Sequence, residues 1–392
     1  MTSDYGGDRR PIALTGATIY TMDGAPIMGG TIVAAQGKIL AVGDRITLPA
    51  DCRMIDVQGA VITPGLIDAH CHLGIAGEGN GWAGEDFNEA TNPVLPGLDV
   101  VDAIHPRDAA LEEAWRSGVT TVMVAPGSAN PIGGQCAVIK TKAASRVDDM
   151  VLRRMAGLKI SFGENPRRIY GEQKKTPATR MGVAYLVREA FLKAREYLAR
   201  QDAEDFRFDL NLEAIARVLR HEMPVRAHAH RADDIVTAIR LAREFDIELV
   251  IEHATEAHLI PDVLAREEVP VVLGPLLTAK RKSELRDRSW EAPYVLNQYG
   301  VPFAIMSDHP VLPAAFLPVY AGLTCRYGLP EDQALAAITS NAAKILGVDD
   351  RVGKLVPEMD ADLVVWSEFP LSLQARPLYV MTDGVLTDLE ED

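Results

Sequence analysis

The central part of the chain, residues 61–345, alternates short apolar runs with longer stretches whose apolar residues recur at helical spacing. Strands that are separated by helices run in the same direction, so this alternation predicts an α/β fold with a parallel sheet. The strand candidates are Val61–Leu66, Thr120–Val124, Leu158–Phe162, Val225–His228, Leu249–Glu252, Val269–Leu273 and Pro302–Met306, with Cys136–Lys140 as a weaker eighth. This number of strands in roughly 285 residues favours a closed (β/α)8 barrel of the TIM type over an open sheet.

The segments between these strands carry helix patterns, with two irregularities. The helix candidates are Arg107–Ser117, Val147–Met155, Met181–Gln201, Leu212–His221, Ala232–Phe245, Leu259–Glu267, Ser283–Tyr299 and Glu331–Leu346. No helix pattern fits between Val124 and Cys136, so one strand–helix unit is incomplete. The long helical stretch over residues 179–221 is typical of an insertion.

Both ends of the chain are rich in short strand patterns separated by glycine, proline and aspartate turns. These patterns cover residues 12–60 at one end and residues 352–386 at the other. We therefore predict a small β-sandwich domain formed by residues 1–60 and 349–392, packed on a barrel domain of residues 61–348.

The charge balance restricts the partners of this chain. Aspartate and glutamate outnumber lysine and arginine by 55 to 40, which gives a formal net charge of −15. Such an acidic protein is a poor general binder of nucleic acid or anionic membranes, so we expect neither as a partner. The four cysteines are too scattered for a disulfide framework. We also expect neither a signal peptide nor a membrane span. The predicted protein is cytoplasmic, forms a homo-oligomer and acts on a small-molecule substrate.

Histidine and aspartate residues gather where the predicted strands end. His70 and His72 follow the first strand, and residues two apart in an extended segment point to the same side, so both imidazoles can bind one ion. The other strand-end residues of this kind are His228, His230, His253 and Asp308. The carboxyl ends of barrel strands carry the active site in this fold, and imidazole with carboxylate suits zinc, iron or manganese. We therefore predict a site for one or two divalent metal ions, most simply zinc.

One more metal ligand is expected near the strand Leu158–Phe162, and two residues compete for this role. Glu164 lies at the carboxyl end of the strand and can bind a metal directly. Lys159 lies inside the strand and can bridge two metals only after its amine is carbamylated to an anion. Without a metal, Glu164 would cap a helix or loop and Lys159 would form a buried ion pair, and the sequence leaves these alternatives open.

Several passages resemble the metal-dependent amidohydrolase superfamily. Residues 61–72, VITPGLIDAHCH, are similar to its signature motif. Residues 340–347 (SNAAKILG), 353–355 and 360–366 of this chain are similar to its usual C-terminal passage. Within the superfamily, the chain is most similar to the branch of imidazolonepropionases and prolidase-like dipeptidases. The metal ligands that this resemblance implies are His70, His72, His228, His253 and Asp308, the last also as proton carrier.

The reaction that the resemblance implies is hydrolysis of a linear or cyclic amide C–N bond by metal-activated water. Asp308 would accept the proton of the water and deliver it to the leaving nitrogen, and His230 or His253 would stabilise the oxyanion. Ring deaminases and imidazolonepropionases usually carry Glu or Gln where this chain has Arg231, which disfavours these alternatives and leaves the substrate open. A catalytically silent structural relative is a further alternative, but such a protein is expected to lose ligands.

The segment of residues 165–180 reverses the acidic charge of the chain, with five basic residues and one acidic residue. It directly follows a strand end, which places it on the catalytic face of a barrel. We predict that Arg167 and Arg168 attract a carboxylate-bearing substrate, with Tyr170 and Arg231 as further substrate-binding candidates. The alternative is a solvated loop or a subunit contact.

Overall fold

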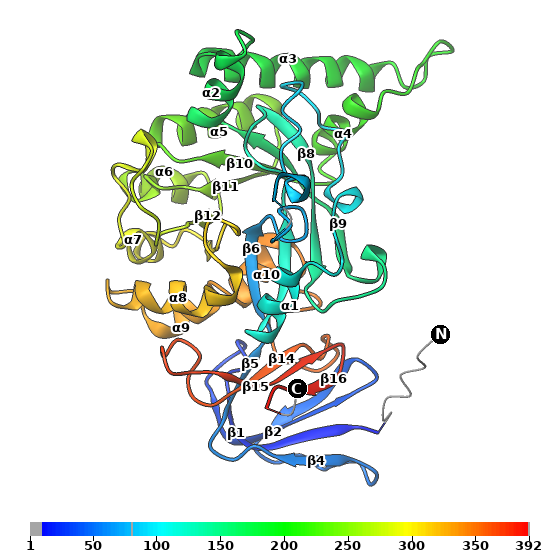
Figure 1. The fold of residues 1–392 in the computed structure, drawn as a ribbon, viewed down its shortest axis with the longest axis vertical. Helices are drawn as coiled ribbons and strands as arrows, with labels where there is room; N and C mark the ends of the chain where they lie inside the picture. The colour runs from blue at the N-terminus through cyan, green and yellow to red at the C-terminus, as the bar shows by residue number, and fades with distance from the viewer. Residues whose placement is uncertain (1–9, 80, 391–392) are drawn as a thin grey trace.

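The central strands form one eight-stranded sheet that curves into a nearly closed barrel in the computed structural model, which describes residues 10–79 and 81–390 (Figure 1). The strand order is β13-β12-β11-β10-β9-β8-β7-β6. The strands are β6 (Leu66–Cys71), β7 (Val119–Val124), β8 (Ile132–Lys140), β9 (Val151–Ser161), β10 (Val225–Ala229), β11 (Leu249–His253), β12 (Val271–Leu273) and β13 (Phe303–Ile305). This mixed α/β arrangement fits the predicted TIM-type barrel.

One strand of the barrel is reversed. β8 pairs antiparallel with both β7 and β9, whereas the other neighbours in the sheet pair in parallel. Antiparallel strands need no crossover helix, which explains the missing helix pattern between Val124 and Cys136. The helix predicted over Val147–Met155 is wrong, because Val147–Asp149 form one 3-10 turn and β9 begins at Val151. This segment pairs with β8, and the local pattern does not reveal that partner.

The barrel strands are buried on both faces. Val250, Val272 and Ala304 belong to one buried apolar cluster, whereas their neighbours Ile251 and Val271 belong to another. Successive residues of a strand point to opposite faces, so each strand needs apolar residues throughout its length. This requirement explains the continuous apolar runs that predict these strands.

Helices connect the strands and cover the barrel. They are α1 (Ala109–Arg116), α2 (Glu164–Glu172), α3 (Arg180–Ala199), α4 (Leu210–Leu219), α5 (Ala232–Phe245), α6 (Pro261–Arg266), α7 (Ala292–Gln298), α8 (Leu317–Cys325), α9 (Glu331–Ala336) and α10 (Ser340–Leu346). α3 and α4 confirm the two helices predicted within residues 179–221, and α2 and α3 lie at the top of Figure 1. Among the described residues, no helix combines the length and the apolar character that crossing a membrane requires.

Hydrogen bonds bring the last barrel strand back to the first. The backbone nitrogen of Asp308 donates to the carbonyl of His70 at 3.2 Å. Asp68 on β6 accepts hydrogen bonds from both the backbone nitrogen of Ser307, at 3.1 Å, and the Ser307 hydroxyl. These bonds join the end of β6 to the segment after β13, so they position His70 beside Asp308.

Strands from both ends of the chain share a second sheet, at the bottom of Figure 1. Its order is β16-β15-β14-β5-β1-β2-β3, with β4 beside β1. The strands are β1 (Ile12–Ile19), β2 (Ile27–Ala35), β3 (Lys38–Gly43), β4 (Arg53–Asp56), β5 (Val61–Pro64), β14 (Leu363–Trp366), β15 (Pro377–Thr382) and β16 (Val385–Asp388). The two ends of the chain meet where β14 pairs with β5. That residues 1–60 and 349–392 form a separate β-sandwich domain stays a prediction.

The predicted strand Val61–Leu66 is divided between the two sheets. Val61–Pro64 form β5 of the terminal sheet, and the barrel strand β6 begins at Leu66. A Cβ atom at Gly65 would lie 2.0 Å from the hydroxyl oxygen of Thr120. Glycine therefore lets the chain pass close to β7 as it leaves one sheet for the other.

Lys140, at the end of β8, joins the barrel to the terminal sheet. Its ammonium lies 2.9 Å from Asp360 and 3.0 Å from Asp362, and it also contacts Asp383. We expect Lys140→Met to lower the free energy of unfolding by about 3 kcal/mol, because it leaves the buried carboxylate of Asp362 without its cation, whereas Asp360 keeps Lys38 and Arg351. Urea unfolding measures this loss. Lys193→Met, which breaks an exposed pair on α3, should change stability by less than about 0.5 kcal/mol, and equal effects of the two substitutions would contradict the prediction.

Candidate active site

Six side chains from four strand ends meet at the carboxyl end of the barrel, and all six are buried. They form two groups, in each of which one possible ligand atom per residue lies within 4.8 Å of the others. One group consists of His70, His72 and Asp308, and the other consists of His228, His230 and His253. The groups adjoin each other, since the ring centroids of His70 and His253 are 5.4 Å apart. The fold thus brings together the histidine and aspartate residues that the sequence predicts as ligands.

The histidine rings are held by their outer nitrogens. Nδ1 of His72 lies 2.7 Å from the carbonyl oxygen of Ala125, and Nδ1 of His253 lies 3.1 Å from that of Gly274. A carbonyl oxygen only accepts, so each Nδ1 carries the hydrogen and each Nε2 keeps its lone pair. Nε2 of His72 points toward the centre, 3.4 Å from Asp308. This arrangement is typical of histidines that bind a metal.

The residues at the centre fit a metal ion. Both ring nitrogens of His228 are buried and have no hydrogen-bond partner among the described residues. Burial lowers the pKa of His228 and His253 well below the usual value, and burial together with the charge of Lys282 lowers the pKa of His230 to about 3. Neutral imidazole is the form that binds a metal, so these rings are ready to act as ligands at neutral pH.

Lys159 reaches the same centre from β9. Its amine lies 3.5 Å from Nε2 of His70 and 3.1 Å from Glu252. Glu252 also lies 2.6 Å from Nδ1 of His70 and is close to the buried guanidinium of Arg226. Burial opposes ionisation of Glu252, but His70 and Lys159 outweigh burial and lower its pKa. The sequence predictions do not include Glu252 and Arg226. A charged residue inside a short apolar strand is unusual, and this pattern could have identified both residues as candidates.

Glu164 lies apart from these groups. It is the first residue of α2, and its backbone nitrogen donates to the buried carboxylate of Glu284 at 2.9 Å. Glu284 also lies 3.6 Å from Nε2 of His230. Of the two candidates for the additional ligand, the fold therefore brings Lys159, and not Glu164, next to the predicted metal ligands.

Two of the central residues have an unusual backbone conformation. The φ angle is +70° at His253 and +57° at Asp308, a region that residues other than glycine rarely occupy. Such conformations cost about 1–3 kcal/mol and persist where the surrounding structure enforces them, often at functional sites. Burial opposes ionisation of Asp308, but its histidine neighbours outweigh burial and hold its pKa well below the usual range.

A cavity of about 530 Å³ opens over the six central residues. Its apolar walls come from Phe87 and from loops after β12 and β13, and its polar groups include Ser128 and Asn165. Two cations, Arg281 and Lys282, line the same cavity and lie in the loop after β12. The sequence predictions do not include these two residues, and nothing in their local pattern distinguishes them from other surface cations.

The four predicted substrate-binding residues do not line this cavity as the described residues define it. Arg168 is exposed on α2, and the ring of Tyr170 is buried. Arg231 forms an exposed ion pair with Asp233. A role of Arg167, Arg168, Tyr170 or Arg231 in substrate binding stays a prediction.

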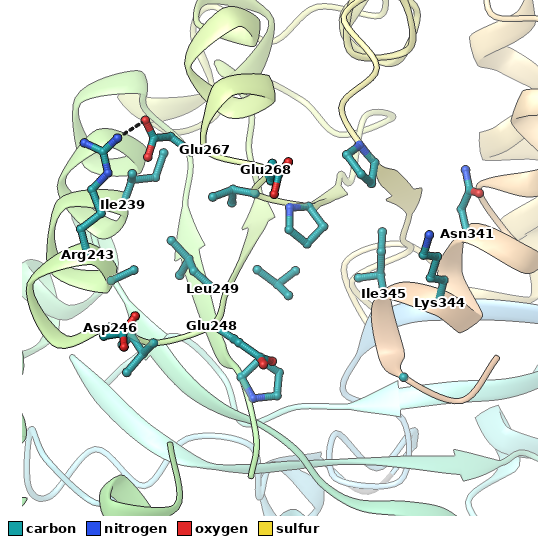
Figure 2. Close-up of a pocket in the computed structure, with 18 of the residues that line it drawn as sticks. Ile239, Arg243, Asp246, Glu248, Leu249, Glu267, Glu268, Asn341, Lys344 and Ile345 are labelled. Atoms are coloured by element: carbon teal, nitrogen blue, oxygen red, sulfur yellow. Dashed lines mark hydrogen bonds and ion pairs between the residues drawn. The ribbon is translucent and has the colours of Figure 1, made fainter. Parts of the chain in front are cut away.

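A larger cavity, of about 820 Å³, lies at the opposite end of the barrel, where the strands begin (Figure 2). Leu249 lines it from the start of β11, and Asn341 and Lys344 line it from α10. The Arg243–Glu267 ion pair lies at its edge in Figure 2. No histidine is among the described residues that line it, and the two groups of candidate metal ligands line the smaller cavity.

Comparisons with known proteins agree with this geometry. A family model described as the amidohydrolase family matches residues 61–387. The chain is 30% identical to amidohydrolase tasK of Hapsidospora irregularis over 96% of its own length, but it spans only 43% of that protein. It is 27% identical to an imidazolonepropionase of Cupriavidus metallidurans, covering 87% of this chain and 85% of that protein.

Solved structures show the same fold. The crystal structure of an amidohydrolase from Thermotoga maritima superimposes with a TM-score of 0.92 at 46% identity, covering 96% of this chain and 99% of that chain. A prolidase complexed with N-methylphosphonate-L-proline superimposes with a TM-score of 0.63 at 19% identity, covering 96% and 99%. At that identity, the second likeness concerns the fold alone.

Proposed function

The chain belongs to the amidohydrolase family, whose members hydrolyse carbon–nitrogen bonds, and we propose that it cleaves an amide C–N bond of a small substrate with one or two divalent metal ions. The observation that carries this proposal is the convergence of His70, His72, His228, His253 and Asp308 in one buried site under a cavity. Zinc suits these ligands best, and iron or manganese is the alternative. Both linear and cyclic amides are candidate substrates.

The roles of the chain's own residues follow from their contacts. A bound divalent metal activates water as a nucleophile near neutral pH and polarises a carbonyl group. Asp308 is buried and ionised, so it can accept the proton of the attacking water and deliver it to the leaving nitrogen. His230 faces the same cavity, where it can stabilise the oxyanion. His253, the alternative for this role, has its Nδ1 hydrogen bonded to Gly274 and its Nε2 free to bind a metal, so His230 is preferred. Glu252 positions His70, and Asp68 positions the segment of Asp308.

A hydrolysis screen tests this function. Purified protein, loaded with zinc, iron or manganese, is offered N-acyl amino acids, dipeptides and cyclic amides, and product formation is compared with that of chelator-treated protein. We expect metal-dependent turnover of at least one of these classes. Turnover that survives complete metal removal would contradict the proposed mechanism. Metal-loaded protein that hydrolyses none of them would favour the catalytically silent relative.

Two substitutions separate the candidates for the additional ligand. We expect Lys159→Met to lower the metal content of the protein, because a carbamylated Lys159 beside His70 would bind metal. Glu164→Gln should leave the metal content unchanged, since Glu164 lies at the start of α2 and belongs to neither group of candidate ligands. Metal analysis gives the stoichiometry, and ¹³C NMR after incubation with labelled bicarbonate detects the carbamate. Metal loss in Glu164→Gln alone would reverse the assignment.

We further propose that the protein forms a homo-oligomer and is cytoplasmic. Size-exclusion chromatography with light scattering measures the oligomeric state.

A further inference from the structure

The charges that line the active-site cavity are mostly positive. Lys282 and Arg281 are exposed, and neither forms an ion pair within the described part of the chain. Asp308 is the one acidic side chain among the described residues that line the cavity, and it contacts the central histidines. In a chain with a net charge of −15, two cations that form no ion pair among the described residues create a local site for an anion.

Hydrogen bonds hold Lys282 at the edge of the cavity. Its ammonium donates to the side-chain oxygen of Asn165 at 2.9 Å, and the Asn165 amide donates to the hydroxyl of Ser128 at 2.7 Å. Lys282 and Ser128 come from the loops after β12 and β7, and Asn165 lies in the first turn of α2, so this chain of bonds connects three sides of the cavity. An ammonium group has three donors, and two of those of Lys282 are left for a ligand.

The loop that carries Lys282 is anchored beside the central histidines. Two residues further on, Glu284 is fully buried, accepts a hydrogen bond from the backbone of Glu164 at 2.9 Å and lies 3.6 Å from Nε2 of His230. Lys282 lines the same cavity as His230 and His253, so its ammonium lies near the reacting centre.

We propose that Lys282 binds a carboxylate group of the substrate close to the scissile amide. The substrate class is therefore an amide with a carboxylate a few bonds from the carbonyl, such as an N-acyl α-amino acid or a dipeptide. This inference rests on the proposed amide hydrolysis, and it assigns the substrate charge to the loop after β12 rather than to the basic segment of residues 165–180. Arg281, at the exposed edge, adds attraction for the same anion.

Matched substrates test this assignment. An N-acetyl amino acid and its neutral C-terminal amide are compared with metal-loaded wild type and Lys282→Met, which keeps the length of the side chain and removes its charge. We expect KM for the carboxylate substrate to rise about 10–100-fold, because a hydrogen bond to a charged group is lost, and KM for the neutral amide to change less than about 2-fold. Lys282→Arg should keep most of the preference for the carboxylate substrate over the neutral amide, and Lys193→Met on α3 should behave like wild type.

The outcomes separate this inference from the proposed function. Equal changes in KM for the charged and the neutral substrate would show that Lys282 only holds the loop in place. This result would overturn the inference but would leave the proposed amide hydrolysis unaffected. If wild type hydrolyses neither compound, the calorimetric affinity for the N-acetyl amino acid decides. Weaker binding of that probe by Lys282→Met than by wild type supports the carboxylate site, and unchanged binding rejects it.

Discussion

Replacing Asp308 with asparagine is expected to lower kcat by about 10²–10⁴-fold, the usual contribution of a general acid–base group. Asparagine keeps the shape of the side chain but cannot accept the proton of the attacking water. The backbone bond from residue 308 to His70 and the bonds between Asp68 and Ser307 do not involve the substituted group, so the barrel should stay closed. Steady-state kinetics on metal-loaded protein, with metal content measured on the same samples, gives the result.

The metal measurement is essential because Asp308 lies 3.4–3.5 Å from His72 and His70 and is also a candidate ligand. A loss of turnover at unchanged metal content would identify Asp308 as the proton carrier. A loss of turnover in proportion to a loss of metal would identify Asp308 as a metal ligand alone. Asp205→Asn, which changes an exposed carboxylate paired with Arg200, is the matched control and should turn over normally. Near-normal kcat in metal-replete Asp308→Asn would exclude the proton-carrier role.

The double substitution of His70 and His72 by alanine is expected to remove the tightly bound metal and, with it, measurable hydrolysis. Both rings have their outer nitrogens held by protein groups and their Nε2 atoms within 3.5 Å of Asp308. Without these two ligands, one of the two buried groups retains only its carboxylate. Metal analysis after dialysis measures the stoichiometry, and the same samples are assayed for activity.

A matched double variant controls for the loss of two imidazoles. His105 and His221 are exposed and do not belong to the histidine groups of the site, so the double substitution of these two residues by alanine should keep the metal and the activity. Retention of full metal stoichiometry after substitution of His70 and His72 would refute the ligand assignment. Circular dichroism of both variants excludes unfolding as the reason for metal loss.

Local patterns in the sequence were sufficient to predict the position of the histidines and of Asp308. Buried parallel strands need apolar residues on both faces, so the strands are recognisable as continuous apolar runs. Since the carboxyl ends of parallel strands gather at one end of a barrel, His70, His228, His253 and Asp308 could be expected to meet although they are far apart in the sequence. Their convergence in the fold follows that expectation.

The remaining contacts of the site depend on which segments become neighbours in the fold. Local sequence patterns do not predict these neighbours. β8 runs antiparallel to β7 and β9, and its pairing with β9 makes Val151–Met155, the second half of the predicted helix, part of a strand. Lys159 lies beside Glu252 because β9 and β11 flank β10 in the barrel. Lys282 reaches the cavity because its loop is anchored by a buried carboxylate and tied to Asn165. Each of these interactions joins residues far apart along the chain, so only the tertiary structure decided the charge of the cavity and the neighbours of the metal ligands.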